Sequence, residues 1–531
     1  MVFSVNSKNY ISLMPYIKKV VLQNFKRFKS FSVILQSEIN LLIGDNEAGK
    51  SSILTAIDIV GSGSKNKVEN IGLEGLFNST VIADFLSSDK RYENLPSLFA
   101  EVYLDDQSDP DLNGNSNSSG VISDGLRMSC EPNDMLSKEI KEILSQQDAI
   151  FPFEYYTITF KTFSGENYTG YRRFLKQILI DNSQINNEYA TREYVKAMYS
   201  SNTKDEEKHK HKNEYRKSKD AFKVSVLADL NHRLATYAFG VRNTHKANLE
   251  TDLMLTEDNI NIENKGKGRQ CFIKTEFALN KNSKNIDIIL LEEPENHLSH
   301  INMKKLINKI RESSGKQLLI TTHSNMISTR LDLRNSILLN SNNAIAVLLE
   351  DLPKDTARFF MKAPDNNIME FILSRKVILV EGDAEFILME QFFKQEGGKL
   401  EESEVHIISV GGTSFKRYLD LAKLLDIKTA VIRDNDRDHQ TNCVEAYTEY
   451  VSEIISIFSD NDNDRSTFEI CVYQDNKPLC ETLFSEDRKT LSVQDYMLKN
   501  KADVAFELLE QNSAVVIAPD YIKAAIRWIK E

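Results

Sequence analysis

A glycine-rich segment near the start of the chain constrains its fold more than any other feature. The sequence GDNEAGKSS, at Gly44–Ser52, follows the apolar run INLLI and fits the pattern G-x-x-x-x-G-K-[ST]. In this pattern backbone N–H groups surround phosphate oxygens, the lysine reaches the outer phosphates and the hydroxyl binds Mg²⁺. Such a loop lies between a buried strand and a helix. We therefore expect an α/β nucleotide-binding domain whose phosphate-contacting residues are Gly44, Asn46, Gly49, Lys50, Ser51 and Ser52.

Two carboxylates end a later apolar strand, IDIILLEE, at Glu292 and Glu293. Ligands of open α/β sheets bind outside the carboxyl ends of the strands. We expect Glu292 to contact the magnesium ion and its water, and Glu293 to polarise the attacking water. The next predicted strand, KQLLITTHS, delivers His323, which can sense the γ-phosphate of ATP by hydrogen bonding. These three side chains complete the predicted ATP site.

A second alternation of strands and helices carries its own acidic residues. Glu381 ends the predicted strand VILVEG, while Asp434 and Asp436 end the strand TAVIRDND. Because helices connect these parallel strands, the carboxylates meet at one edge of the sheet. Glu385 follows Glu381 by one helical turn and faces the same way. Several carboxylate oxygens at one point predict a Mg²⁺ or Mn²⁺ site suited to phosphodiester chemistry.

The length of 531 residues requires more than one core. We predict an ATPase domain in two parts, 1–164 and 236–370, interrupted by a helical insert at 165–235 and followed by a second α/β domain at 371–531. Helical apolar spacing in YRRFLKQILI and FKVSVLADLNHRLATYAF supports the insert. The lysine-rich segment at 204–223 is either a solvated helix face or a surface that touches phosphates.

Composition excludes several other classes of protein. No apolar run approaches the roughly 20 residues of a membrane helix, and the first residues do not resemble a signal peptide, so we expect a cytoplasmic protein without membrane contact. Five cysteines without a C-x-x-C pair argue against a zinc site or a disulfide framework. The net charge of −12 argues against a protein whose surface is covered with Lys and Arg for binding nucleic acid. It does not exclude nucleic-acid binding, because acidic catalytic pockets contribute to the negative charge.

The first half of the chain resembles the ABC-type ATPases of the SMC and RecF group. The resemblance rests on NFKRFKSF followed by INLLIGDNEAGKSSIL, on KGKGRQ in the place of the signature loop, and on ENHLSH in the place of the dimer-facing loop. It implies an ATP-stabilised dimer in which Gly266 and Gly268 of one subunit complete the ATP site of the other. Lys267 stands where that group has a serine.

The second α/β segment resembles the Toprim domain, in which a Glu follows the first strand, Gly follows the second and D-x-D follows the third. An SMC-like ATPase joined to a Toprim domain is the layout of the OLD (overcoming lysogenisation defect) family of nucleases. The segments LLEEPENHLSH, ITTHS, VILVEGDAEF and DNDRD resemble motifs of that family in the same order. The resemblance further implies that Glu481, in CETLF, is another acid near the metal, and that Lys501, in NKADVAFELLEQ, contacts the scissile phosphate.

This resemblance implies an ATP-binding, ATP-regulated, metal-dependent DNA endonuclease or nickase that acts in anti-phage defence. It also implies a homodimer or higher oligomer formed through the helical insert. The implied partners are DNA and a second defence protein, either a helicase-like protein, as in Gabija systems, or a retron reverse transcriptase with its RNA-linked DNA. The sequence leaves open a sensor or clamp ATPase that binds DNA without cleaving it. A topoisomerase or primase is disfavoured because we find neither their accompanying domains nor a zinc-binding segment.

Overall fold

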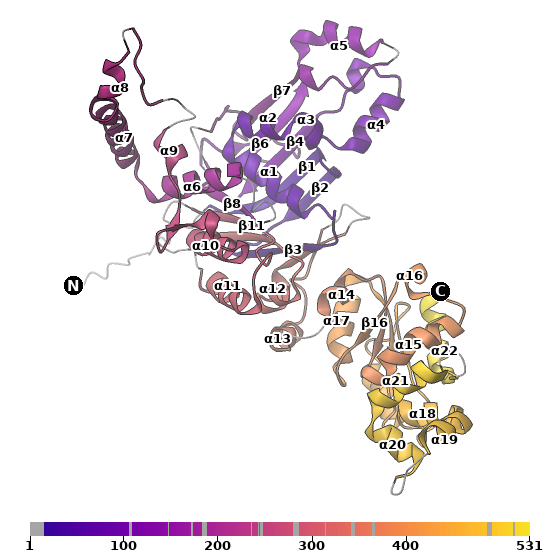
Figure 1. The fold of residues 1–531 in the computed structure, drawn as a ribbon. Helices are drawn as coiled ribbons and strands as arrows, with labels where there is room; N and C mark the ends of the chain where they lie inside the picture. The colour runs from indigo at the N-terminus through magenta and orange to yellow at the C-terminus, as the bar shows by residue number, and fades with distance from the viewer. Residues whose placement is uncertain are drawn as a thin grey trace, which may run out of the picture. The chain divides into compact units, whose positions relative to one another are not determined.

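The computed structural model shows a chain of two compact units (Figure 1). The first contains Met1–His323 and Asn335–Ala346, and the second contains Ser324–Arg334 and Val347–Glu531. The predicted start of the last domain at residue 371 therefore lies inside the second unit. The structure describes residues 15–531 except 106–108, 147, 171–173, 183–187, 235, 243, 245–247, 280–285, 314, 341–345, 364–366, 486–490 and 513–515.

An antiparallel sheet forms one part of the first unit. Its strands lie in the order β2-β1-β4-β6-β5, and β7 also pairs with β6. Burial alternates along β2, as expected of a strand with one face in the core. The strands are β1 (Ile17–Phe25), β2 (Phe28–Ile34), β4 (Leu98–Leu104), β5 (Asn113–Gly114), β6 (Ser123–Pro132) and β7 (Tyr156–Thr162).

The second sheet of this unit carries the nucleotide-binding loop. Its order is β14-β13-β3-β12-β11-β8, and the pairs that join β13, β3, β12, β11 and β8 are parallel. The carboxyl ends of β3, β12 and β11 therefore lie side by side. The strands are β3 (Ile39–Gly44), β8 (Gln177–Asp181), β11 (Ile288–Glu292), β12 (Gln317–Thr321), β13 (Ser336–Leu339) and β14 (Ala346–Leu348).

The first unit also contains helices outside the insert. The helix α1 follows the phosphate loop and is buried along most of its length, so it forms part of the core. The helices of this part are α1 (Lys50–Ser62), α2 (Lys65–Ile71), α3 (Leu73–Leu76), α4 (Ser79–Ser87), α5 (Ser137–Leu144), α10 (Lys267–Leu279) and α11 (His300–Glu312). Within the described residues, none of the helices is long and apolar enough to cross a membrane.

Among its described residues, the insert forms the helices α6 (Glu188–Asn202), α7 (Asp205–Ser225) and α8 (Ala228–His232). The helix α9 (Leu249–Asp252) follows the insert. The helix predicted for YRRFLKQILI is wrong at Gln177–Asp181, which is the strand β8 paired with β11. A short apolar run has no clear periodicity, so a buried parallel strand resembles a buried helix. Residues 171–173 of that segment lie outside the described residues. No residue of α7 is buried.

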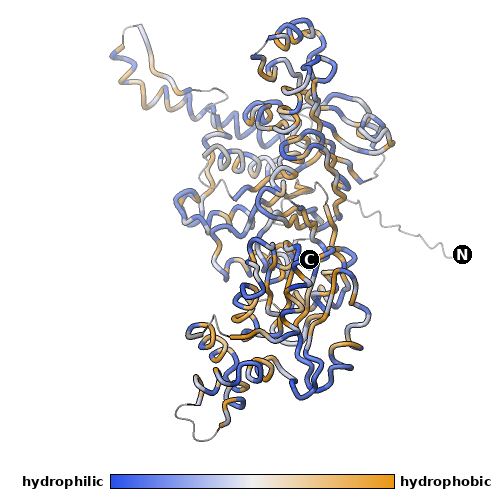
Figure 2. Tube along the Cα trace, turned by 90° about the vertical axis from the view of Figure 1, so that its right-hand side faces the viewer, coloured by the Kyte–Doolittle hydropathy of each residue, from blue (hydrophilic) through white to orange (hydrophobic). Residues whose placement is uncertain are grey.

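The second unit contains a four-stranded parallel sheet in the order β16-β15-β17-β18. Its central strands are hydrophobic along most of their length (Figure 2). The strands are β15 (Lys376–Val380), β16 (Val405–Ser409), β17 (Lys428–Ile432) and β18 (Ile455–Phe458). The helices are α12 (Asn325–Arg330), α13 (Lys354–Lys362), α14 (Ile368–Leu373), α15 (Asp383–Gln395), α16 (Leu400–Ser403), α17 (Phe415–Leu425), α18 (Phe468–Asp475), α19 (Lys477–Phe484), α20 (Val493–Lys499), α21 (Lys501–Asn512) and α22 (Asp520–Lys530).

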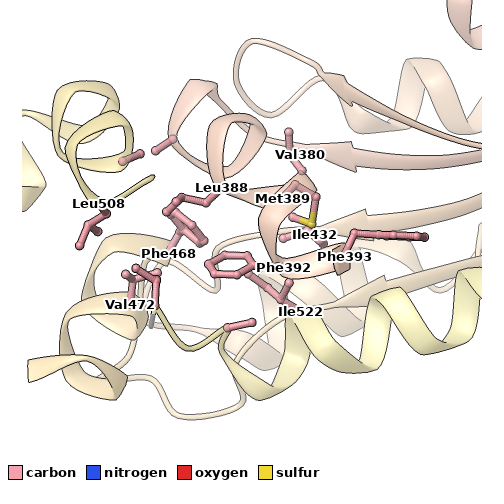
Figure 3. Close-up of a cluster of buried hydrophobic side chains, with 14 of the residues drawn as sticks. Val380, Leu388, Met389, Phe392, Phe393, Ile432, Phe468, Val472, Leu508 and Ile522 are labelled. Carbon is pink, nitrogen blue, oxygen red and sulfur yellow. The ribbon is translucent and has the colours of Figure 1, made fainter. Parts of the chain in front are cut away.

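A hydrophobic core joins α15, α18, α21 and α22 to one face of this sheet (Figure 3). Phe392 of α15 and Phe468 of α18 are both fully buried, and their ring centroids lie 6.5 Å apart in an edge-on arrangement. Leu508 of α21 and Ile522 of α22 belong to the same core. This packing fixes the first turns of α15 and α18, where acidic side chains stand at the edge of the sheet.

Candidate functional sites

The phosphate loop of the first unit has the close backbone packing that its glycines predict. Gly49 adopts φ 95° before α1, and a Cβ at this residue would lie 2.3 Å from Cζ of Phe28. The Lys50 Nζ atom donates hydrogen bonds to the carbonyl oxygens of Gly44 at 2.7 Å and Asp45 at 2.9 Å. Burial lowers the pKa of Lys50, although nearby carboxylates, Glu293 first, oppose the shift.

The predicted acids of the ATP site lie beside this loop. Burial raises the pKa of Glu292, whose carboxylate also accepts a hydrogen bond from Ser51. Glu293 adopts φ 44°, and its Oε1 atom lies 3.6 Å from Nε2 of His323. Burial and the charge of Lys50 lower the pKa of His323. The structure thus brings Lys50, Ser51, Glu292, Glu293 and His323 together. Asn46 is exposed and Ser52 is buried on either side of Gly49.

Sequence reasoning missed Glu295, which organises the same site. Its Oε1 atom accepts hydrogen bonds from Oγ1 of Thr322 at 2.7 Å and from the backbone N of His323 at 2.8 Å. Burial raises the pKa of this carboxyl. Glu295 therefore fixes the backbone that carries His323. The sequence feature that could have indicated this role is the position of Glu295 in EEPEN, two residues after Glu293.

Two residues at the end of β8 were also missed. Asp181 lies opposite Glu292 in the parallel pair, and its charge contributes to the raised pKa of Glu292 after burial. Asn182 is fully buried, and both polar atoms of its side chain lack a hydrogen-bond partner in the described structure. A buried amide in this state is costly unless a ligand or water satisfies it. Both residues directly follow the segment YRRFLKQILI, where a predicted helix stood in place of the strand β8.

The proposed signature loop begins α10. Gly268 packs against the loop after β11, because a Cβ there would lie 2.2 Å from the carbonyl oxygen of His297. Gly266 and Lys267 are exposed. This exposure leaves the start of α10 accessible to another molecule. The contact of Gly266 and Gly268 with the ATP site of a second subunit stays a prediction.

The second unit gathers four carboxylates where strands of its sheet end. Glu381 follows β15, Asp434 follows β17, and Glu385 and Glu469 lie in the first turns of α15 and α18. Burial, with the charges of its acidic neighbours, raises the pKa of Glu385 to about 7 and that of Asp434 to about 8. The pKa of Glu381 is raised for the same reasons. The cluster therefore has an excess of negative charge that a cation would relieve.

Lys501 contributes an ammonium group to this cluster of carboxylates. Its Nζ atom lies 2.9 Å from Oε1 of Glu469 at the start of α21. Burial alone would lower the pKa of Lys501, but the hydrogen bond to Glu469 and the charges of Asp434 and Glu385 raise it overall. Lys501 therefore stays protonated beside the carboxylates.

Asp436 lies at the rim of the cluster. It adopts φ 50°, its side chain is half exposed, and its Oδ2 atom lies 3.3 Å from Nη2 of Arg433. The other guanidinium nitrogen, Nη1, lies 4.0 Å from Oε2 of Glu381. Arg433 thus places a positive charge between two of the predicted ligands.

The place of Glu481 near the metal stays a prediction. This residue lies on α19, where its Oε1 atom accepts a hydrogen bond of 2.6 Å from the hydroxyl of Tyr473. Sequence reasoning missed Glu469, whose charge acts on Glu381, Glu385 and Asp434. The sequence feature that could have indicated Glu469 is its position as a single acid inside the apolar run FEICVY.

The donor set fits a hard divalent cation. All four acidic groups are carboxylates, the ligands that Mg²⁺ and Mn²⁺ prefer. Oε2 of Glu381 and Oε2 of Glu469 are buried without a hydrogen-bond partner among the described residues. In the described part of the chain, however, no three His, Cys, Asp or Glu side chains already stand where they could hold a metal ion.

The fold and these two sites define a P-loop ATPase joined to a parallel α/β domain with an acidic edge. Residues 16–227 match the family model described as AAA ATPase domain. Residues 372–436 match the model described as overcoming lysogenization defect protein-like, TOPRIM domain. The chain therefore combines an AAA ATPase domain with an OLD-like Toprim domain. The predicted α/β fold class is confirmed.

Three curated proteins are similar to parts of the chain. Old nuclease of Escherichia phage P2 is 29% identical over 180 residues, which cover 31% of this chain and 30% of that protein. Endonuclease GajA of Bacillus cereus strain VD045 is 28% identical over 163 residues, which cover 30% of this chain and 28% of that protein. Structural maintenance of chromosomes protein 6 of Saccharomyces cerevisiae is 38% identical over 90 residues, which cover 15% of this chain and 8% of that protein. The matched segments thus span less than a third of each relative.

A solved structure gives a similar comparison. The C-terminal region of the OLD protein of Xanthomonas campestris pv. campestris is 22% identical, with a TM-score of 0.21. The match covers 30% of this chain and 95% of that chain.

Proposed function

We propose that this chain is an ATP-binding DNA endonuclease or nickase that depends on a divalent metal ion and is regulated by ATP. The observation that carries the proposal is the group of four carboxylates, three of them buried and Glu381 partly exposed, with Lys501 at one edge of the Toprim sheet. Two relatives that match part of the chain are named as nucleases, which supports the same activity.

In the proposed reaction the chain's own residues bind and orient the phosphodiester. Glu381, Glu385, Asp434 and Glu469 hold Mg²⁺ or Mn²⁺, with Asp436 at the rim. A bound divalent ion lowers the pKa of its water and stabilises charge on the phosphate. Lys501 stabilises negative charge that develops on the scissile phosphate. Because the pKa values of Glu385 and Asp434 are raised, both carboxyls release protons when an ion binds.

ATP regulates this activity from the first unit. Ser51 and Glu292 hold the magnesium ion of the nucleotide, Glu293 polarises water, and His323 contacts the γ-phosphate. Gly266 and Gly268 of a second copy complete the site, so the active form is a homodimer or higher oligomer. The helical insert supports this assembly, because Phe222, Val224 and Val226 expose apolar side chains to solvent.

The biological role rests on resemblance alone. The proposed setting is anti-phage defence, in which the chain acts with a helicase-like protein or with a retron reverse transcriptase and its RNA-linked DNA.

The test is cleavage of supercoiled and linear DNA by purified protein, with and without Mg²⁺, Mn²⁺ and ATP. We expect nicked or linear products only when a divalent ion is present, an effect of ATP on their rate, and no product from Glu381→Gln. Metal-independent cleavage, or equal cleavage by Glu381→Gln, would assign the activity to another site.

A second function is a DNA clamp whose Toprim domain does not cut. Arg433 favours it, because its guanidinium group already places a positive charge 3.3 Å from Asp436 and 4.0 Å from Glu381. DNA binding that depends on ATP, with no cleavage under any of these metal conditions, would establish that reading.

A further inference from the structure

Arg433 is the second positive charge of the Toprim cluster, and its side chain is buried directly after β17. The Nη1 atom of this side chain has no hydrogen-bond partner among the described residues. The same is true of Oε2 of Glu381, which lies 4.0 Å away, beyond the length of a hydrogen bond. A buried donor and a buried acceptor thus lie near each other without bonding, an arrangement that is costly unless another group satisfies them.

The other contacts of Arg433 are long. Its Nε atom donates a hydrogen bond of 3.3 Å to the carbonyl oxygen of Asn442, and its Nη2 atom donates one of 3.3 Å to Oδ2 of Asp436. Arg465 of the same unit differs, because Nη1 and Nη2 donate hydrogen bonds of 2.9 Å to the two carboxylate oxygens of Asp475. Such a double contact holds a guanidinium group in one orientation. Arg433 is held more weakly, so it can exchange its partners at a lower cost.

The two cations of the cluster act on different carboxylates. Burial raises the pKa of Glu381, and the charge of Arg433 is the main influence that opposes this shift. Burial also raises the pKa of Asp434, where the opposing charge is that of Lys501. Arg433 is therefore the cation that serves Glu381 and Asp436, two of the residues predicted to bind the metal ion.

A divalent ion on Glu381 would repel Arg433, because both are positively charged and both act on the same carboxylate. A guanidinium group that leaves a carboxylate needs another anion. Its planar N–H groups match the geometry of phosphate. Nη1, which has no hydrogen-bond partner among the described residues, is a donor for such a contact. A phosphate group beside the metal ion would therefore replace the contacts that Arg433 loses.

We propose that Arg433 is a counter-ion of the Toprim site that exchanges its partner when DNA binds. It neutralises Glu381 and Asp436 while no metal ion is present. Once these carboxylates hold a divalent ion, Arg433 donates Nη1 to a phosphate oxygen of the DNA backbone. The inference rests on the proposed function and couples metal binding to DNA binding, so that each strengthens the other.

Calorimetry with Mn²⁺, in the absence of nucleotide and DNA, tests the counter-ion role. An opposite charge within about 4–6 Å lowers the affinity of a carboxylate for a proton by about 10–10³-fold, and it acts on a metal ion in the same direction. Arg433→Gln and a second neutral variant, Arg433→Met, should therefore bind Mn²⁺ about tenfold more tightly or better. Arg433→Lys keeps the charge and should bind Mn²⁺ with nearly the wild-type affinity. The matched control, Arg437→Gln, removes an exposed charge four residues later and should change nothing.

The direction of the change separates this role from a structural one. An arginine that only holds its loop in place would, when replaced, leave Mn²⁺ binding unchanged or weaken it. Urea unfolding followed by Trp528 fluorescence confirms that each variant is folded. Unchanged or weaker Mn²⁺ binding in both neutral variants would overturn the counter-ion role.

Fluorescence anisotropy tests the exchange with a phosphorothioate duplex, which keeps the backbone charge and resists cleavage. Mn²⁺ should tighten duplex binding by the wild type relative to EDTA, a readout that needs no substitution. Arg433→Gln should lose about tenfold of this gain, the effect of one charge-assisted hydrogen bond to phosphate. Equal affinity of the wild type for the duplex in Mn²⁺ and in EDTA would overturn the exchange.

These measurements fail separately from the proposed function. A wild type that cuts DNA, with no gain of Mn²⁺ affinity in the neutral variants, would overturn the role of Arg433 and leave the nuclease intact. Mn²⁺ binding by Arg433→Gln but not by the wild type would show that Arg433 blocks the site, which overturns the exchange and supports the clamp. A wild type that binds Mn²⁺ and DNA without cutting would overturn the nuclease, while tighter Mn²⁺ binding by Arg433→Gln would still support the counter-ion role.

Discussion

The ammonium group of Lys501 lies 2.9 Å from Oε1 of Glu469, a side chain that is only 4% exposed. The pair joins the first turn of α21 to the first turn of α18. It also neutralises one of the four carboxylates at the edge of the Toprim sheet. The lysine assigned to the scissile phosphate is thus already oriented by a carboxylate of the same cluster.

Lys501→Ala should separate binding of the metal from cleavage. The variant keeps all four carboxylates, so its affinity for Mn²⁺ should stay within about threefold of the wild type. Cleavage should fall by about 10²–10³-fold, the usual effect of removing a group that stabilises charge in the transition state. Calorimetry measures metal binding and gel electrophoresis measures cleavage. The matched control is Lys499→Ala, an exposed lysine two residues earlier. Full cleavage by Lys501→Ala would remove this residue from the mechanism.

Asp434 should have a structural role besides its role at the metal. Its Oδ1 atom accepts a hydrogen bond of 2.8 Å from the backbone N of Phe468, the first residue of α18. Asp434→Asn keeps this acceptor, whereas Asp434→Ala leaves a buried N–H group unpaired. Both variants should lose cleavage, but Asp434→Ala should be less stable by about 1–3 kcal/mol. Equal unfolding midpoints for the two variants would show that the hydrogen bond does not stabilise α18.

The metal-free Toprim unit should become less stable as the pH rises. The pKa of Glu385 is raised from 4.5 to about 7, and that of Asp434 from 3.8 to about 8. At pH values between the unfolded and the folded pKa of each carboxyl, the folded state binds more protons than the unfolded state. The free energy of unfolding therefore falls with increasing pH. The contribution is complete below the unfolded pKa values and is lost as the pH passes the folded values.

Unfolding in urea with EDTA measures this effect. Trp528, the single tryptophan of the chain, lies in the second unit and reports its unfolding by fluorescence. Glu385→Gln should flatten the pH dependence, whereas Glu390→Gln, exposed on the same helix, should not. Mg²⁺ should stabilise the unit more at high pH because its ligands are then deprotonated. A stability that rises between about pH 5 and pH 8 in EDTA would contradict the assignment.

Lys50→Ala should lose ATP binding while both units stay folded. The ammonium group closes the loop by hydrogen bonds to two carbonyl oxygens when no nucleotide is present, and it contacts phosphate oxygens when ATP binds. Nucleotide titration measures the loss, and circular dichroism with the Trp528 signal confirms folding. Wild-type affinity in this variant would remove the phosphate-binding role from Lys50.

Glu293→Gln should bind ATP and hydrolyse it slowly. Its Oε2 atom accepts a hydrogen bond of 2.7 Å from Nδ2 of Asn296, and the amide oxygen of Gln can replace that contact. Binding and folding should therefore persist, while the carboxylate that polarises water is lost. Steady-state phosphate release tests the role. Release at the wild-type rate would move the role to Glu292.

The parts of the fold that sequence predicted best were strand ends that carry chemical groups. The phosphate loop, the ends of β11 and β12, and the acids after β15 and β17 all follow from short motifs joined to apolar runs. Gln177–Asp181 could not be assigned because its apolar side chains fit a helix or a strand, and only pairing with β11 decides between them. Glu469 was missed for a related reason, because tertiary packing of α18 brings it to the cluster.

The parallel pair of β8 and β11 has a consequence for synthesis of the chain. Gln177 pairs with Ile288, so roughly 110 residues, including the insert, separate the partners. Loop-closure entropy grows only with the logarithm of length, by about 0.6 kcal/mol per doubling, so the final fold tolerates a long excursion. The ribosome nevertheless releases β8 well before β11, its neighbour in the sheet. Until then the backbone N–H and C=O groups of β8 lack their partner strand, and the nascent chain is exposed to aggregation at this edge.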